Sequence, residues 1–199
     1  MISAQFEELL LQSLTHERGG VLVYETALEC AINEDLRSEW TTYHSQTQSH
    51  VAALVAVCES LGLDAGEMTP GCRIVQHTGK ALVTAMKMAL AEGNKAAAEL
   101  VACECVVLAE TKDHADWELL GQCAQALDGE AATVLTAAVE QIEEEEDEHL
   151  YHTQGWCREL WLKSLGLDAV LPPPEDRKNV KSAAGAEKAK KERTAQTGR

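Results

Sequence analysis

The sequence predicts an all-α fold in which two long antiparallel helical hairpins pack together as a four-helix bundle. The chain has 199 residues, of which 45% are hydrophobic, and it is rich in Ala, Leu, Glu and Gln, all good helix formers. Its four prolines are Pro70 and the run 172–174, so about a hundred residues between them contain no proline, which favours long helices. Apolar residues recur at spacings of three and four, which is the helical period.

Each predicted element is bounded by its own turn signals. The first hairpin breaks at residues 33–35, and its second arm ends at Gly62. A loop over 63–72 leads to a third helix, expected over 73–91, which connects the two hairpins. The second hairpin begins near Asn94, turns at the pair Asp128-Gly129 and continues to about Ser164. We therefore expect residues 1–171 to form one helical bundle.

The last residues differ in composition from the rest. Residues 172–199 hold eight Lys or Arg and four Asp or Glu, a local charge of +4, which leaves −20 for the preceding residues because the whole chain carries −16. We expect 172–199 to be a flexible, disordered basic tail. The acidic bundle repels nucleic acid and attracts cations, so nucleic-acid binding is expected at most weakly, through the tail.

Other features of the chain point to a cytoplasmic protein. No apolar run approaches the roughly 20 residues that span a bilayer, and the start carries Glu7 and Glu8 where a secretory signal would be apolar. The seven cysteines form no compact framework, which fits reduced thiols in a cytoplasm. We expect no membrane association and, because helical bundles commonly pair, a homodimer.

The predicted last bundle helix carries a carboxylate and an imidazole on its core-facing side. Glu146 and His149 lie three residues apart between apolar residues, a spacing that lets both reach one metal ion. The acidic run 143–148 is in part a solvated face, but six successive residues turn through more than a full circle, so at least one points inward. Glu143 or Glu145 could take the place of Glu146.

Three further polar residues lie on core-facing stripes at matching heights. Glu17 and Glu110 precede the two hairpin turns, and His50 and Glu146 follow them, each by about 16 to 18 residues, or roughly 25 Å along a helix. If the hairpins pack antiparallel, these groups meet at one level. His114 stands one turn from Glu110 as a further candidate ligand. Buried carboxylates are costly without a cation, so the pattern predicts a metal site.

This arrangement resembles the ferritin-like superfamily, and more narrowly the bacterial stress-associated ferritin-like proteins of unknown function, which are distant relatives of rubrerythrin. The similarity covers roughly residues 6–165 and rests on short motifs. These are Phe6-x(10)-Glu17, Leu36, Thr47-x-x-His50-Val51, Leu61-Gly62, Pro70-Gly71, Glu110 and the turn near Asp128. The resemblance implies a ferritin-like bundle with one or two metal ions between its helices.

The chain departs from that family on the predicted second helix. A carboxylate is expected beside His50, but Gln46 and Thr47 stand there, and Glu39 is too far along the helix to replace it. The site therefore holds two unequal metal ions, or a single ion near Glu110, Glu146 and His149, or none.

The sequence supports two functions of different classes. The first is a non-haem protein that binds iron or manganese through Glu17, His50, Glu110, Glu146 and His149, with Gln46 behind these ligands, and that reacts with oxygen or peroxide. The second is a metal-free helical scaffold that binds other proteins and keeps its buried polar residues as a hydrogen-bonded network. The missing carboxylate on the second helix favours the scaffold, and the matching heights favour the metal.

Overall fold

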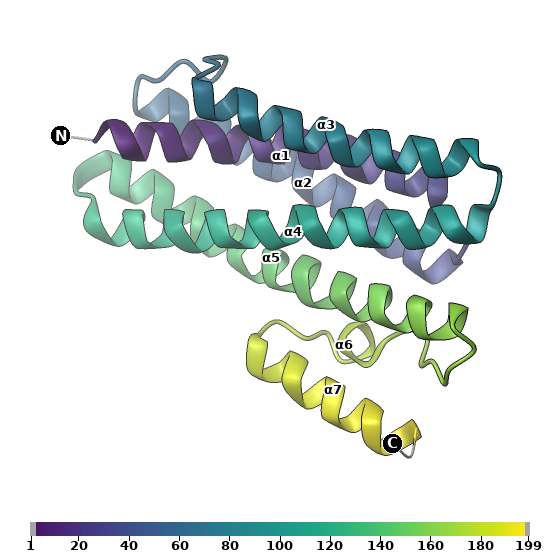
Figure 1. The fold of residues 1–199 in the computed structure, drawn as a ribbon. Coiled ribbons are helices and arrows are strands. Elements are labelled where there is room, and N and C mark those ends of the chain that lie inside the picture. The colour runs from purple at the N-terminus through teal and green to yellow at the C-terminus, as the bar shows by residue number, and fades with distance from the viewer. Residues whose placement is uncertain (1–2, 198–199) are drawn as a thin grey trace.

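The computed structural model describes residues 3–197 of the chain, and this part is all-helical, as predicted. Figure 1 shows long helices lying side by side, with the C-terminal helices packed along one edge. The helices are α1 (Ala4–Cys30), α2 (Glu34–Ser60), α3 (Pro70–Ala91), α4 (Lys95–Ala126), α5 (Gly129–Ser164), α6 (Pro174–Arg177) and α7 (Ala183–Thr197).

Helices α1 to α4 begin at residues whose side chains cap free backbone N–H groups. Ser3, Asn33 and Asn94 accept hydrogen bonds from the first turns of α1, α2 and α4, as such caps commonly do. Thr69 does the same for α3, which starts at Pro70, three residues earlier than predicted, because proline is well tolerated in a first turn. The two hairpin turns lie where the sequence places them.

Helices α1, α2, α4 and α5 surround the interior, and α3 packs over α1 and α4 (Figure 1). The connecting helix predicted between the hairpins is therefore present, although it lies outside the group of four. None of the helices in residues 3–197 is long and apolar enough to cross a membrane.

The apolar core is divided into two clusters along the bundle. One cluster contains Phe6, Leu54 and Ile142 near the end where α1 begins, and the other contains Trp40 and Trp156 toward the opposite end. On each of the four helices, the buried residues of one cluster are separated from those of the other by buried polar residues. The fold thus places a polar layer in the middle of an apolar core.

The expected disordered tail is wrong for most of its length. Residues 174–177 and 183–197 form α6 and α7, which lie along α5 on its side away from α3 (Figure 1). The Arg158 guanidinium forms two hydrogen bonds with Glu175, at 2.8 and 2.9 Å, and both Arg158 and Arg193 donate to Glu159. Because Glu159 and Glu175 are almost fully buried, this charge network holds the basic segment against the acidic bundle.

Replacing Arg158 with methionine is expected to detach α6 and α7 and to lower the free energy of unfolding by about 3 kcal/mol. The variant leaves Glu175 and part of Glu159 buried without their cation, and losing one partner of a buried ion pair typically costs about 3–5 kcal/mol. Chemical denaturation measures the loss, and limited proteolysis reports release of the tail. Lys163→Met, at an exposed position of α5, is the matched control. Equal stability and equal protease resistance in the two variants would contradict the docked tail.

Candidate metal centre

The five predicted site residues lie together in the polar layer between the two apolar clusters. Glu17 comes from α1, His50 from α2, Glu110 from α4, and Glu146 and His149 from α5. Their side chains are almost completely buried, with exposed fractions between 0% and 3%. Glu17 and His149 are 132 positions apart in the sequence. The antiparallel packing of the hairpins therefore brings distant residues to one level of the bundle.

These residues form two groups that share one carboxylate. Glu17, His50 and Glu146 offer ligand atoms within 4.8 Å of one another, and so do Glu110, Glu146 and His149. Glu146 Oε1 lies 3.0 Å from Nδ1 of His50 and 3.5 Å from Nδ1 of His149. Two adjacent positions for a cation are thus defined, with Glu146 between them.

Several buried atoms of the centre form no well-aligned hydrogen bond with the described residues, although His50 Nδ1 and Glu146 Oε1 lie 3.0 Å apart. They are Glu17 Oε2, Glu110 Oε2, both Glu146 carboxylate oxygens, His50 Nδ1 and His149 Nδ1. Buried polar atoms are nearly always paired, because an unpaired one loses its hydration without compensation. A group of such atoms, all carboxylate oxygens and imidazole nitrogens, is the donor set that a divalent metal ion would satisfy.

The opposite atoms of the same side chains are fully engaged. His50 Nε2 lies 2.8 Å from Glu145 Oε2, and His149 Nε2 lies 3.0 Å from Gln46 Oε1. Because Glu145 and the Gln46 oxygen accept hydrogen bonds, each Nε2 carries the proton and donates it outward. Nδ1 of each ring is consequently aimed at the carboxylates, as metal-binding histidines require.

Two aromatic residues orient the flanking carboxylates. Trp117 donates its indole N–H to Glu17 Oε1 at 2.7 Å, and Tyr24 donates its hydroxyl to Glu110 Oε1 at 2.8 Å. In both carboxylates the oxygen without a partner is the other one, Oε2. In Glu110 the free oxygen lies 3.5 Å from His149 Nδ1, whereas in Glu17 the oxygen nearest His50, at 3.5 Å from Nδ1, is the one that accepts from Trp117.

The electrostatics of the centre favour bound positive charge. Burial alone would lower the pKa of His50, but the carboxylates of Glu146 and Glu17 raise it to about 11. Burial raises the pKa of Glu146 to about 7, although His50 and His149 act in the opposite direction. Without another cation the cluster thus retains protons, and a metal ion would replace them.

The structure also decides between the alternatives that the sequence leaves open. Glu146 is the inward-facing member of the acidic run, whereas Glu143 is exposed and Glu145 supports His50 from behind. His114 lies outside both groups and pairs with Asp147 at 2.9 Å. Gln46 lies behind His149 and contacts its Nε2, the supporting position that the sequence analysis predicts for it.

The carboxylate missing from α2 leaves a specific gap in the donor set. Thr47, three residues before His50, is buried, and its hydroxyl donates to the backbone carbonyl of Tyr43. On α5 the corresponding pair is Glu146 and His149. The centre therefore has one shared carboxylate from α5 and none from α2.

Sequence reasoning missed a neighbouring polar cluster and one acidic residue. Glu39, His152 and Asp176 offer ligand atoms within 4.8 Å of one another, and Tyr43 lies 2.9 Å from His152 Nδ1. Asp176 belongs to the segment expected to be disordered, so no spacing argument could include it. Asp113, one turn from Glu110, is also buried. Its burial, and to a smaller extent the negative charge of Glu17, raises its pKa well above the usual range.

Comparisons of the chain with protein-family models, with curated proteins and with solved structures found no match. The resemblance to ferritin-like proteins therefore stays a prediction, and the geometry of the centre has to support the function.

Proposed function

We propose that this protein binds iron or manganese between its four central helices. The observation that carries the proposal is the set of unpaired oxygen and nitrogen atoms aimed at two adjacent positions. Glu17, His50 and Glu146 would hold an ion at the first position, and Glu110, Glu146 and His149 at the second. Carboxylate and imidazole ligands suit iron, manganese and zinc better than copper(I).

The chemistry of such a centre is redox chemistry with oxygen or peroxide when iron or manganese is bound. The protein contributes a buried site with few ligands, so open coordination positions remain for a small reactant. Tyr24 and Trp117 hold the flanking carboxylates in place, and Gln46 and Glu145 fix the two imidazole rings. Apolar clusters on both sides exclude bulk water.

The alternative is a metal-free helical scaffold that interacts with other proteins. Thr47 favours it, because a centre of this kind with a carboxylate absent from α2 binds metal less strongly. The pairing of the chain as a homodimer stays a prediction under either function.

Elemental analysis of the untagged protein decides between the two functions. The protein is purified without chelator from cells supplied with iron and manganese. We expect between one and two equivalents of either metal, the upper limit being set by the two groups. Absence of bound metal, together with no thermal shift on adding iron(II), manganese(II) or zinc(II), would overturn the metal proposal and support the scaffold.

A further inference from the structure

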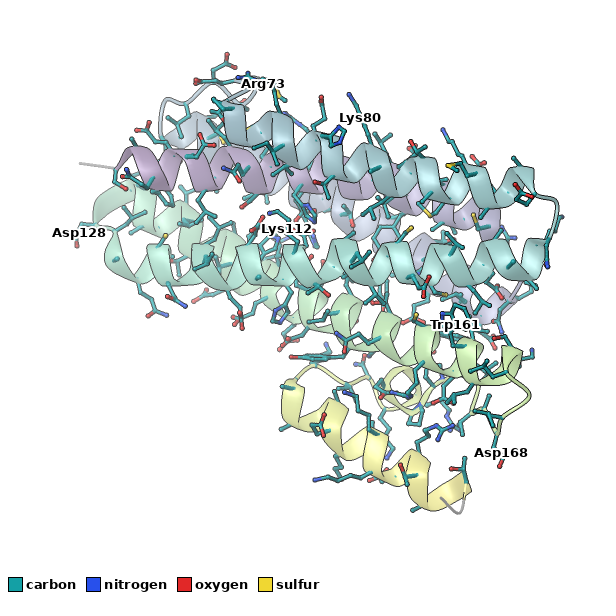
Figure 2. All side chains as sticks on the ribbon, in the orientation of Figure 1. Arg73, Lys80, Lys112, Asp128, Trp161 and Asp168 are labelled. Atoms are coloured by element: carbon teal, nitrogen blue, oxygen red, sulfur yellow. The ribbon has the colours of Figure 1, made fainter. Side chains whose placement is uncertain are left out.

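Helix α3 carries an unusual charge for this acidic chain. It contains no Asp or Glu between Pro70 and Ala91, whereas Arg73, Lys80 and Lys87 recur at intervals of seven residues. Seven residues make about two helical turns, so the three cations share one side of α3. Figure 2 shows Arg73 and Lys80 on the outer side of the bundle, away from α5.

A cavity of about 430 Å³ lies between α3 and α1 on this basic side. Its apolar lining includes Leu22, Met68 and Val83, and Leu22 and Met68 are 49% and 38% exposed. Three cations also line it: Arg18, Lys80 and Lys87. Cavities that hold small ligands commonly measure about 300–1,000 Å³ and combine apolar walls with a few polar groups, as this one does.

A second cavity of about 180 Å³ continues the first. Both are lined by Thr15, Gly19 and Gly79, and the second also reaches Leu108 and Lys112 of α4; we call the two adjacent cavities the groove. The space beside α1 and α3 therefore extends beyond the larger cavity.

Gly19 is the residue that keeps this groove open. Glycine is among the least favourable residues in a helix interior, so its presence in α1 requires a reason. Close packing explains the neighbouring Gly20, because a Cβ there would lie 3.2 Å from the Thr47 methyl group. A Cβ at Gly19 would meet no atom within 4 Å. Gly19 thus lines both cavities at the place where α1 and α3 approach closely, since a Cβ at Gly79 would lie 3.7 Å from the Gly19 Cα.

The three cations that line the larger cavity have no acidic partner among the described residues, whereas Lys112, which lines the second cavity, pairs with Asp116. The ion pairs of lysine and arginine in this part of the chain involve other residues, and Lys80 donates only to the neutral Gln76 amide, at 3.0 Å. Other lysines and arginines of the described chain also lack an ion-pair partner, so the distinguishing feature of Arg18, Lys80 and Lys87 is their position around the same apolar cavity. Their charge complements an anion.

We propose that the groove between α1 and α3 binds a long-chain carboxylate, with the hydrocarbon chain against Leu22 and Val83 and the carboxylate near Lys80 and Lys87. The apolar lining accounts for the chain, and the unpaired ammonium groups account for the head group. The site lies on another side of α1 from the metal centre and does not depend on bound metal.

Calorimetric titration of the full-length protein with dodecanoate, below its micellar concentration, tests the proposal. Dodecyltrimethylammonium has the same chain with a positive head group, and dodecanol has a neutral one. Nonspecific attraction to a chain of charge −16 would favour the cation. We expect saturable binding of dodecanoate and at least tenfold weaker binding of the other two compounds. Equal binding of the three, or no binding of dodecanoate, would overturn the assignment.

Two sets of variants locate the site. Gly19→Leu introduces a side chain into the groove, and its Cβ would meet no atom within 4 Å, so it should abolish dodecanoate binding while thermal stability is kept or rises, because leucine favours a helix. Lys80→Gln/Lys87→Gln should weaken binding about tenfold, and Lys95→Gln/Lys163→Gln, with the same loss of charge elsewhere, should leave it unchanged. Unchanged binding in Gly19→Leu would refute the groove as the site. Binding only to anionic vesicles, with Gly19→Leu unaffected, would also refute it and assign the basic side of α3 to a membrane surface.

Discussion

Glu146→Ala is expected to abolish metal binding at both positions of the centre, because Glu146 is the only residue that belongs to both groups of the polar layer. Mutation of a residue that merely supports a metal ligand typically lowers metal affinity about 10- to 100-fold. Loss of a shared ligand should therefore lower metal affinity by at least roughly 100-fold. Elemental analysis and titration with manganese(II) measure the loss. Far-ultraviolet circular dichroism should show the helices retained, since Glu146 makes no hydrogen bond that a helix end depends on.

The acidic run around Glu146 provides matched controls for this variant. Glu143→Ala removes an exposed carboxylate of the same helix and should leave metal content unchanged. Glu145→Ala removes the acceptor of the His50 Nε2 proton, so affinity should fall by an intermediate amount. Metal content in Glu146→Ala equal to that of the parent protein would refute the assignment of Glu146 as a ligand. Loss in Glu143→Ala alone would place the metal on the outer face of α5.

Thr47→Glu is expected to produce a tight second metal equivalent by supplying the carboxylate that α2 lacks. Position 47 is buried and precedes His50 by three residues, the same spacing as between Glu146 and His149 on α5. The new carboxylate would add one anionic ligand to the position of Glu17 and His50. Without metal it would be a further buried charge, so the thermal stability of the metal-free variant should fall below that of the parent.

The thermal shift on adding manganese(II) separates this effect from a general electrostatic one. It should be larger in Thr47→Glu than in the parent, because binding restores the stability lost without metal. Ser49→Glu adds the same charge at an exposed position of α2 and should change neither stoichiometry nor thermal shift. Equal shifts in Thr47→Glu and Ser49→Glu would show that position 47 does not face a metal position.

Most of the helical architecture could be predicted from local features of the sequence. Asn33, Asn94 and the Asp128-Gly129 turn mark helix boundaries through interactions within a few residues, so they act before any tertiary contact forms. The tail was misjudged for the opposite reason. Its composition is typical of disorder, but Glu175 is buried and accepts hydrogen bonds from Arg158, 17 residues earlier in the chain. Composition carries no information on such a partner.

In the candidate metal centre, too, local features could be predicted from the sequence, whereas contacts between distant residues could not. Helical period and hairpin height place Glu17, His50, Glu110, Glu146 and His149 at one level of the interior, because both quantities depend only on the regular rise of a helix. The individual atoms that face one another depend on side-chain rotamers and on hydrogen bonds from distant residues. Only the tertiary structure shows that Tyr24 holds Glu110 Oε1 while Oε2 faces His149, and that Trp117 donates to Glu17 Oε1, the oxygen nearest His50.

The groove between α1 and α3 had no counterpart in the sequence analysis, because the charge of the whole chain conceals a basic helix. Its walls come from two helices whose packing leaves space beside Gly19, and no periodicity within either helix reports that space. Sequence alone therefore established the long helices before residue 165, most of their ends and the level of the buried polar residues, all of which follow from local geometry. The sharing of Glu146, the docked tail and the groove were decided by contacts between distant segments, which exist only once the helices have packed.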